Sequence, residues 1–186
     1  MPADPFTMLE TDHRQVARML KSLADSEPGS EREDLVVRLT QAFDVHAEFE
    51  EAAVYPLVTK VMGAETETEA EVEHRLAREG LVKLSELVAT PGFGAAVEML
   101  EGGITHHVEE EEGEIFPTLR GALDDDVKAQ LVSDLRAAKS AAGLPVVDVE
   151  SATKEELLQV AADVGIAGRS AMTKDQLAEA LTRSSS

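Results

Sequence analysis

The sequence HAEFEEAAVYP at residues 46–56 returns as HVEEEEGEIFP at residues 107–117, 61 positions later. The same shift relates His13 to His74, where DHR at residues 12–14 matches EHR at residues 73–75. Four of the five histidines therefore occupy equivalent places in two halves of the chain. A repeat of this kind predicts two helical hairpins of the same design.

Helix signals on either side of the repeat give the expected order of elements. Asp4 and Pro5 suit the N-cap and the first helical position, and a box of Thr66 and Glu69 predicts the start of a third helix. Pro56 is expected to break or bend the second. The predicted helices cover about residues 4–24, 30–56, 66–89 and 93–117, with a further amphipathic helix at 124–142.

The composition favours helices, with 43% hydrophobic but only 3% aromatic residues. We predict an all-α fold: a four-helix bundle with an extra helix at residues 1–142, a linker at 143–150 and a small helix-turn-helix appendage at 151–186.

The charge and the absence of cysteine exclude several kinds of protein. A formal net charge of −20 disfavours binding to phosphate backbones or anionic lipid. The chain has no cysteine, which excludes disulfides and thiolate chemistry. Neither a secretory signal nor a membrane helix is recognisable, so we expect a cytoplasmic protein.

The spacing of histidine and glutamate predicts a metal site in the bundle core. His46 and Glu50, like His107 and Glu111, lie four residues apart, so both side chains project from one helical face. At 100° per residue this face is also the apolar one. Buried imidazoles and carboxylates in register require a common partner, and bundle interiors hold metal sites of this type.

The donor types narrow the metal without choosing it. Nitrogen and oxygen donors without sulfur favour iron, with manganese or zinc as alternatives, and two carboxylates shared between two ions would form bridges. An alternative interpretation is that the histidines are ordinary core residues of a helical bundle that binds other proteins. The neighbouring acids are expected to form a solvated face or to contact the ligands without binding the metal. They are Glu109, Glu110, Glu112 and Glu114.

The two copies of the motif, with the histidines upstream, resemble the hemerythrin-like HHE cation-binding family over about residues 4–120. The resemblance implies an up-and-down four-helix bundle with two iron ions in an oxo- or carboxylate-bridged site. The ligand positions of the family fall on His13, His46, Glu50, His74, His107 and Glu111.

The chain departs from the oxygen-carrying members of that family. Arg78 stands where the carriers have a fifth ligand histidine. Water, Glu79, Tyr55 or His106 could replace the missing donor. A labile metal position suits small oxidants, so the resemblance implies catalase-like or peroxidase-like decomposition of hydrogen peroxide by a di-iron oxidoreductase. The alternative is a module that binds or senses oxygen, nitric oxide or iron without turnover.

The C-terminal segment carries two further capping boxes, Thr153 with Glu156 and Thr173 with Gln176. It resembles the Rho N-terminal or SAP-like helical hairpin, which touches nucleic acid in some proteins. Here four basic and five acidic residues leave no basic footprint. We therefore expect a passive role or docking to a protein partner rather than nucleic-acid binding.

Overall fold

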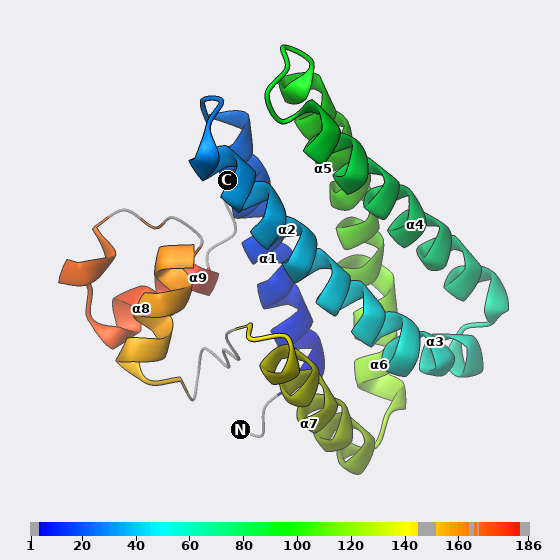
Figure 1. Ribbon diagram of the computed structural model, residues 1–186. Coiled ribbons are helices and arrows are strands. Elements are labelled where there is room, and N and C mark those ends of the chain that lie inside the picture. The colour runs from blue at the N-terminus through cyan, green and yellow to red at the C-terminus, as the bar shows by residue number, and fades with distance from the viewer. Residues whose placement is uncertain (1–3, 145–151, 164–165, 167, 183–186) are drawn as a thin grey trace.

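The computed structural model describes residues 4–144, 152–163, 166 and 168–182, and all regular elements among them are helices. Four long helices lie side by side in Figure 1: α1 (Pro5–Ala24), α2 (Ser30–Phe49), α4 (Ala64–Leu87) and α5 (Phe93–Glu110). Each packs against two neighbours, in the order α1, α2, α4, α5 and back to α1. The predicted up-and-down four-helix bundle is confirmed. None of the described helices is both long and apolar enough to cross a membrane.

Two short π-helices continue α2 and α5 at equivalent places of the repeat. They are η1 (Glu50–Val54) and η2 (Glu111–Ile115), and α3 (Tyr55–Val61) and α6 (Phe116–Ala122) follow them directly. The N–H of Tyr55 donates to the carbonyl of Glu50, five residues back. The wider π turn precedes a proline that cannot donate a hydrogen bond, so the helix continues past Pro56 rather than ending there.

The predicted helix starts are partly right. Asp4 caps α1, and its carboxylate accepts a hydrogen bond from the N–H of Phe6 at 3.4 Å. The predicted box at Thr66 is wrong, because α4 already begins at Ala64. Gly63 precedes that helix with φ of 114°, a conformation that favours glycine. The turn at Gly63 lets the helix begin two residues before Thr66.

The apolar core of the bundle consists of two clusters, one toward each end of the helices. One cluster joins the start of α1 to η1, α3, α6 and α7 (Asp125–Ala141), with Phe6, Tyr55 and Phe116 fully buried. The other joins the far halves of the four long helices, with Leu20, Leu39 and Leu84 among its most buried side chains. Helix α7 thus completes the core at one end of the bundle.

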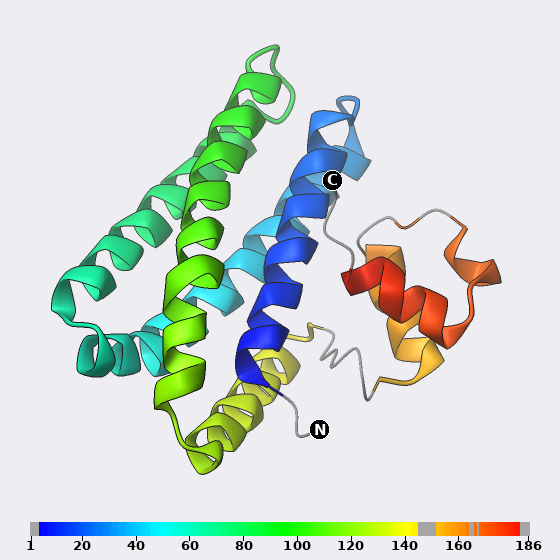
Figure 2. The ribbon, with the colours of Figure 1, turned by 180° about the vertical axis from the view of Figure 1, so that it is seen from behind.

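The C-terminal hairpin consists of α8 (Lys154–Asp163), the 3-10 helix η3 (Arg169–Ala171) and α9 (Lys174–Thr182). The box of Thr173 and Gln176 is confirmed, with the two reciprocal hydrogen bonds at 2.9 and 3.2 Å. The stretch Val146–Val149 and the side chain of Glu156 lie outside the described residues, and the boundaries proposed for the linker stay predictions. Figure 2 shows the hairpin beside α1, where the guanidinium of Arg18 donates to the carbonyls of Ala180 and Leu181 at 2.7 and 3.2 Å.

Replacing Arg18 by Ala should loosen the hairpin from α1 and leave the bundle intact. The variant loses charged hydrogen bonds at a half-buried contact, which we expect to weaken docking by about 1 kcal/mol. Hydrogen exchange in α9 should accelerate, while exchange in α2 and α4 stays unchanged. Lys21→Ala, on the same helix, is the matched control, and equal exchange of α9 in both variants would contradict the role given to Arg18.

Candidate metal centre

The six predicted ligands meet in a polar layer between the two apolar clusters. Each long helix contributes one histidine, and each π-helix contributes the glutamate at its first position. All six side chains are at most 5% exposed: His13, His46, Glu50, His74, His107 and Glu111. The structure therefore brings together every residue that the spacing predicted.

The imidazoles form two pairs whose Nε2 atoms converge. Nε2 of His13 lies 3.1 Å from Nε2 of His46, and the same distance separates Nε2 of His74 from Nε2 of His107. Two nitrogens that each lie about 2.1 Å from one ion are about 3 Å apart when the angle at the ion is close to 90°. Each pair thus has the separation expected of two ligands on one metal ion.

The two glutamates lie between the histidine pairs. Oε2 of Glu50 is 3.0 Å from His46 and 3.4 Å from His74, so one carboxylate reaches both pairs. Oε2 of Glu111 is likewise 3.2 Å from His13 and 3.4 Å from His107. Two buried groups have the geometry of metal ligands. One comprises His13, His46, Glu50 and Glu111, and the other comprises Glu50, His74, His107 and Glu111. Because both groups include both carboxylates, Glu50 and Glu111 lie between two sets of histidines that could hold metal.

Oxygen atoms inside this layer lack hydrogen-bond partners. Both carboxylate oxygens of Glu50 and Oε2 of Glu111 are buried and accept no hydrogen bond. Burial by itself raises the pKa of Glu50, but the imidazoles of His46 and His74 more than offset it and hold that pKa well below its usual range. Burial lowers the pKa of His46, yet Glu50 and Asp12 raise it to about 10. Unpaired ionised oxygens that face convergent nitrogens fit a bound cation.

A carboxylate lies behind the Nδ1 atom of each ligand histidine and comes from a different helix. The four pairs are His13 with Glu112 at 2.9 Å, His74 with Glu51 at 3.0 Å, His107 with Glu73 at 2.9 Å and His46 with Asp12 at 3.8 Å. The first three are hydrogen bonds, and the fourth is a longer electrostatic contact. Such carboxylates fix the orientation of the ring and make Nε2 a stronger ligand.

Sequence reasoning found only Glu112 among these four acids, and only as one of two alternatives. Asp12 and Glu73 differ by the repeat distance of 61, as do Glu51 and Glu112, so the repeat itself contained the signal. Nothing in the spacing points to Lys139 of α7, which forms a buried salt bridge with Asp12.

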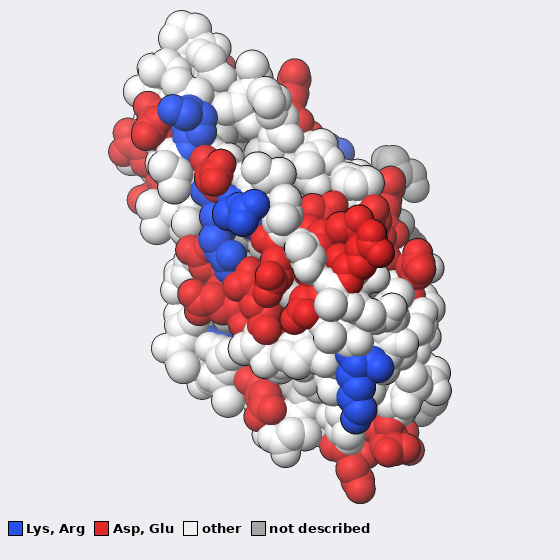
Figure 3. Space-filling model, turned by 90° about the vertical axis from the view of Figure 1, so that its right-hand side faces the viewer, with Lys and Arg blue, Asp and Glu red and all other residues white. Residues whose placement is uncertain are grey.

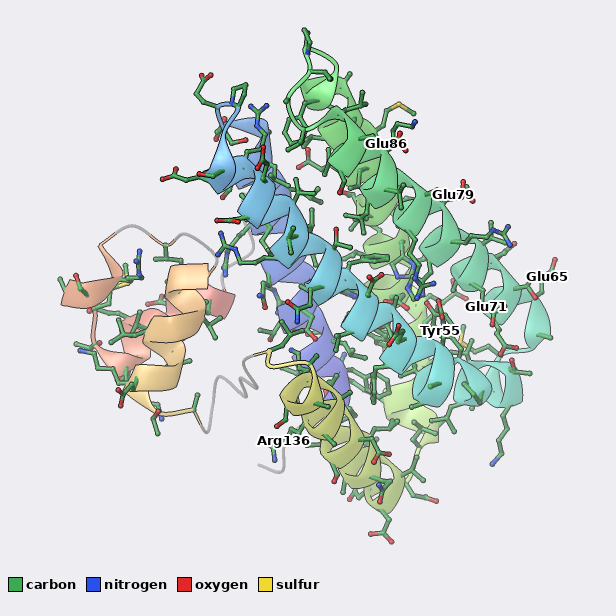
Figure 4. All side chains as sticks on the ribbon, viewed as in Figure 1. Tyr55, Glu65, Glu71, Glu79, Glu86 and Arg136 are labelled. Carbon is green, nitrogen blue, oxygen red and sulfur yellow. The ribbon has the colours of Figure 1, made fainter. Side chains whose placement is uncertain are left out.

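The structure separates the candidates for the missing fifth donor. The hydroxyl of Tyr55 lies 3.1 Å from Nε2 of His74 and donates to Oε1 of Glu111 at 3.2 Å. Glu79 is exposed on the outer side of α4, away from Tyr55, in Figure 4. His106 is 65% exposed, and its Nε2 faces Glu73 and Glu110. Of the three side chains proposed, only Tyr55 reaches the centre.

Arg78 stands at the position of that donor, and it holds an orienting carboxylate instead of binding at the centre. Its guanidinium donates to both oxygens of Glu51, at 2.8 and 3.3 Å. Glu51 in turn binds Nδ1 of His74, so Arg78 holds the carboxylate that orients a ligand. The ring of Tyr55 stacks on His74, and the equivalent Phe116 stacks on His13.

A cavity of about 450 Å³ between α1 and α5 reaches one ligand. His13 and its partner Glu112 form part of the wall, with Ala17, Thr105 and Ile104 beside them. His13 is the one inner ligand that lines this cavity.

One comparison with known proteins identifies a cation-binding family. The profile of the family described as Hemerythrin HHE cation binding domain matches residues 4–119. A DNA nickase of Nostoc sp. (strain PCC 7120 / SAG 25.82 / UTEX 2576) is 24% identical over 135 residues, which are 72% of this chain and 38% of that protein. The chain therefore spans well under half the length of this relative. No solved structure matches significantly.

Replacing Lys139 by Met should destabilise the metal-free chain by about 3–5 kcal/mol, because it leaves the buried carboxylate of Asp12 without its cation. Urea unfolding measures the change. Lys128→Met is the matched control on the same helix, where the ammonium group contacts Asp125 only at 3.9 Å, and it should change stability by less than about 0.5 kcal/mol. Equal stability of the two variants would contradict the role of the buried salt bridge.

Proposed function

The chain belongs to the hemerythrin HHE cation-binding family, and from this premise we propose that it holds two iron ions and decomposes hydrogen peroxide in a catalase-like reaction. The ligands proposed for the ions are the six buried residues His13, His46, Glu50, His74, His107 and Glu111. One observation carries the proposal: two pairs of converging imidazoles share two buried carboxylates, and three of the four carboxylate oxygens accept no hydrogen bond.

The choice of iron rests on the donors. Imidazole nitrogen with carboxylate oxygen suits iron, manganese and zinc, and among these iron and manganese change their oxidation state. Carboxylate-rich sites in the cores of helical bundles hold pairs of such ions. The four orienting carboxylates and the phenol of Tyr55 would complete the surroundings.

The access route favours a substrate of very few atoms. The six ligands are buried, and the cavity beside His13 lies between α1 and α5. Hydrogen peroxide, oxygen and nitric oxide are all small enough for such a route. Peroxide is the one of the three that can both accept and donate two electrons.

The reaction balances within a pair of peroxide molecules. One molecule takes up two electrons and two protons and gives two waters, and the other gives up two electrons and two protons and leaves as oxygen. The iron ions, when bound, would supply and recover the two electrons. The protein must therefore hold protons near the centre between the two halves of the cycle.

Two side chains near the centre differ in their protonation. Burial raises the pKa of Glu112, but His13 more than offsets it and lowers that pKa, so the carboxylate that lines the cavity is ionised and pairs with Nδ1 of His13. Burial raises the pKa of Tyr55, and Glu50 and Glu111 raise it further, so the hydroxyl keeps its proton. Tyr55 is then a permanent hydrogen-bond donor to Oε1 of Glu111.

A second candidate is a sensor of oxygen, nitric oxide or iron that does not turn over. The contact of α9 with α1 favours it, because α1 carries the ligand His13 and Arg18 on that helix holds the hairpin. A change at the centre that displaced α1 would then reach the hairpin, which could pass it to a protein partner.

The name of the nickase relative does not carry DNA cleavage to this chain. Acidic side chains gather over the face shown in Figure 3, with fewer basic ones between them. The chain has 37 acidic and 17 basic residues. Affinity for DNA depends on basic residues that neutralise phosphates, so we propose no nucleic-acid substrate.

The first test compares iron content and oxygen release from peroxide in the wild-type chain and in Glu111→Gln. The wild type should hold about two irons per chain and release one oxygen molecule for every two peroxides. The amide of the variant cannot bridge as an anion, so iron content and oxygen release should both fall by about tenfold or more. Glu114→Gln, an exposed position three residues along, is the matched control and should behave as wild type.

The outcomes separate the two candidates. Two irons without oxygen release would favour the sensor, and ligand-dependent spectra would then be measured with nitric oxide. A chain that retains no iron after mild dialysis, with Glu111→Gln indistinguishable from wild type, would refute both.

A further inference from the structure

A second group of metal-binding side chains lies on the surface, between α4 and α5. Nε2 of His106 is 3.5 Å from Oε1 of Glu73 and 3.4 Å from Oε1 of Glu110. The three atoms lie within 4.8 Å of one another and come from an imidazole and two carboxylates. His106 and Glu110 repeat, one residue earlier on the same helix, the four-residue spacing of the inner ligands His107 and Glu111.

Glu73 connects this surface group to the inner centre. Its Oε2 accepts the hydrogen bond from Nδ1 of His107 at 2.9 Å, while its Oε1 faces His106. One carboxylate therefore touches an inner ligand with one oxygen and the surface group with the other. Glu73 is 20% exposed, and it also lines the apolar groove between α4 and α5 with His106.

The other half of the repeat lacks such a group. Val45 and Phe49 stand where the second half has His106 and Glu110. The carboxylate equivalent to Glu73 is Asp12, which is buried and held by Lys139. Of these two equivalent acids only Glu73 is partly exposed, and the imidazole of His106 meets it at the surface.

The burial of the inner centre makes the entry of a metal ion difficult, and the surface group of the second half can assist that entry. The inner ligands are almost fully buried, so a hydrated ion cannot bind all of them at once from solvent. It must lose water stepwise, and a partly exposed site with anionic ligands next to a buried ligand makes the first step cheaper.

We propose that Glu73, His106 and Glu110 form an external site for a divalent transition-metal ion, and that the inner centre is loaded through it. The site offers one nitrogen and two carboxylate donors and leaves the remaining positions to water, a set suited to Fe²⁺, Mn²⁺ or Zn²⁺. Glu73 binds the incoming ion through Oε1 while Oε2 stays on His107. The loading role rests on the proposed inner iron centre, whereas binding at the external site does not.

The binding test uses Mn²⁺ as the probe on the iron-loaded chain at about 0.15 M salt, where weak surface attraction is screened. Electron paramagnetic resonance of free Mn²⁺ should show one additional ion bound per chain. Affinity should fall by about tenfold or more in His106→Ala and in Glu110→Gln, because each removes a direct ligand. Glu98→Gln makes the same charge change at an exposed position of α5 and should bind as wild type. Equal affinity in all four chains would overturn the external site.

The loading test follows the incorporation of Fe²⁺ into the metal-free chain. His106→Ala should slow incorporation several-fold and reach the same final iron content, because the inner ligands are intact. Glu98→Gln should load at the wild-type rate. External binding with an unchanged loading rate would overturn the loading role. If Glu111→Gln holds no inner iron but still binds Mn²⁺ through His106, the external site stands and only the inner centre fails.

Discussion

Two glutamate carboxylates buried between four helices are the constraint on which the rest of this molecule depends. Glu50 and Glu111 are fully buried, and their oxygens face imidazoles and the hydroxyl of Tyr55 but no lysine or arginine among the described residues. Ionised groups in such a place cost several kcal/mol each unless a strong partner offsets them. A bound cation can provide that partner, and the apolar clusters above and below keep water from replacing it. Packing and metal binding are therefore two aspects of one arrangement.

The internal repeat builds this arrangement, and its broken positions give the two halves different tasks. Ligands, π-helices and orienting acids all recur 61 residues apart, so each metal position has the same basic design. Tyr55 adds a hydroxyl where Phe116 has none. Arg78 holds Glu51, whereas the equivalent Glu112 borders the cavity beside His13. A symmetric scaffold thus surrounds two histidine pairs whose neighbouring side chains differ chemically.

The sequence predicted the features that follow the short period of a helix, and it missed the features that depend on contacts between residues far apart in the chain. Helix-period spacing predicted four of the inner ligands, because residues four apart on a helix share a face, and the repeat of 61 positions added His13 and His74. The start of α4 was misplaced because Gly63, with its positive φ, overrode a capping box at Thr66. The continuation past Pro56 needed a π turn, for which no spacing rule exists. Lys139 is 127 positions from Asp12, so only the packing of α7 on α1 could bring them together.

The closure of the site limits the chemistry it can perform. A centre whose ligands are at most 5% exposed excludes bulky substrates, so specificity follows from size before any contact is made. The cavity at His13 and the partly exposed acid Glu73 lie at different ligands, one on the α1 side and one on the α4 side of α5. On the proposed function, a small molecule would reach the centre at His13 and an incoming ion would reach it at Glu73. Separate routes would let the small-molecule route stay narrow, because the larger hydrated ion would not have to pass through it.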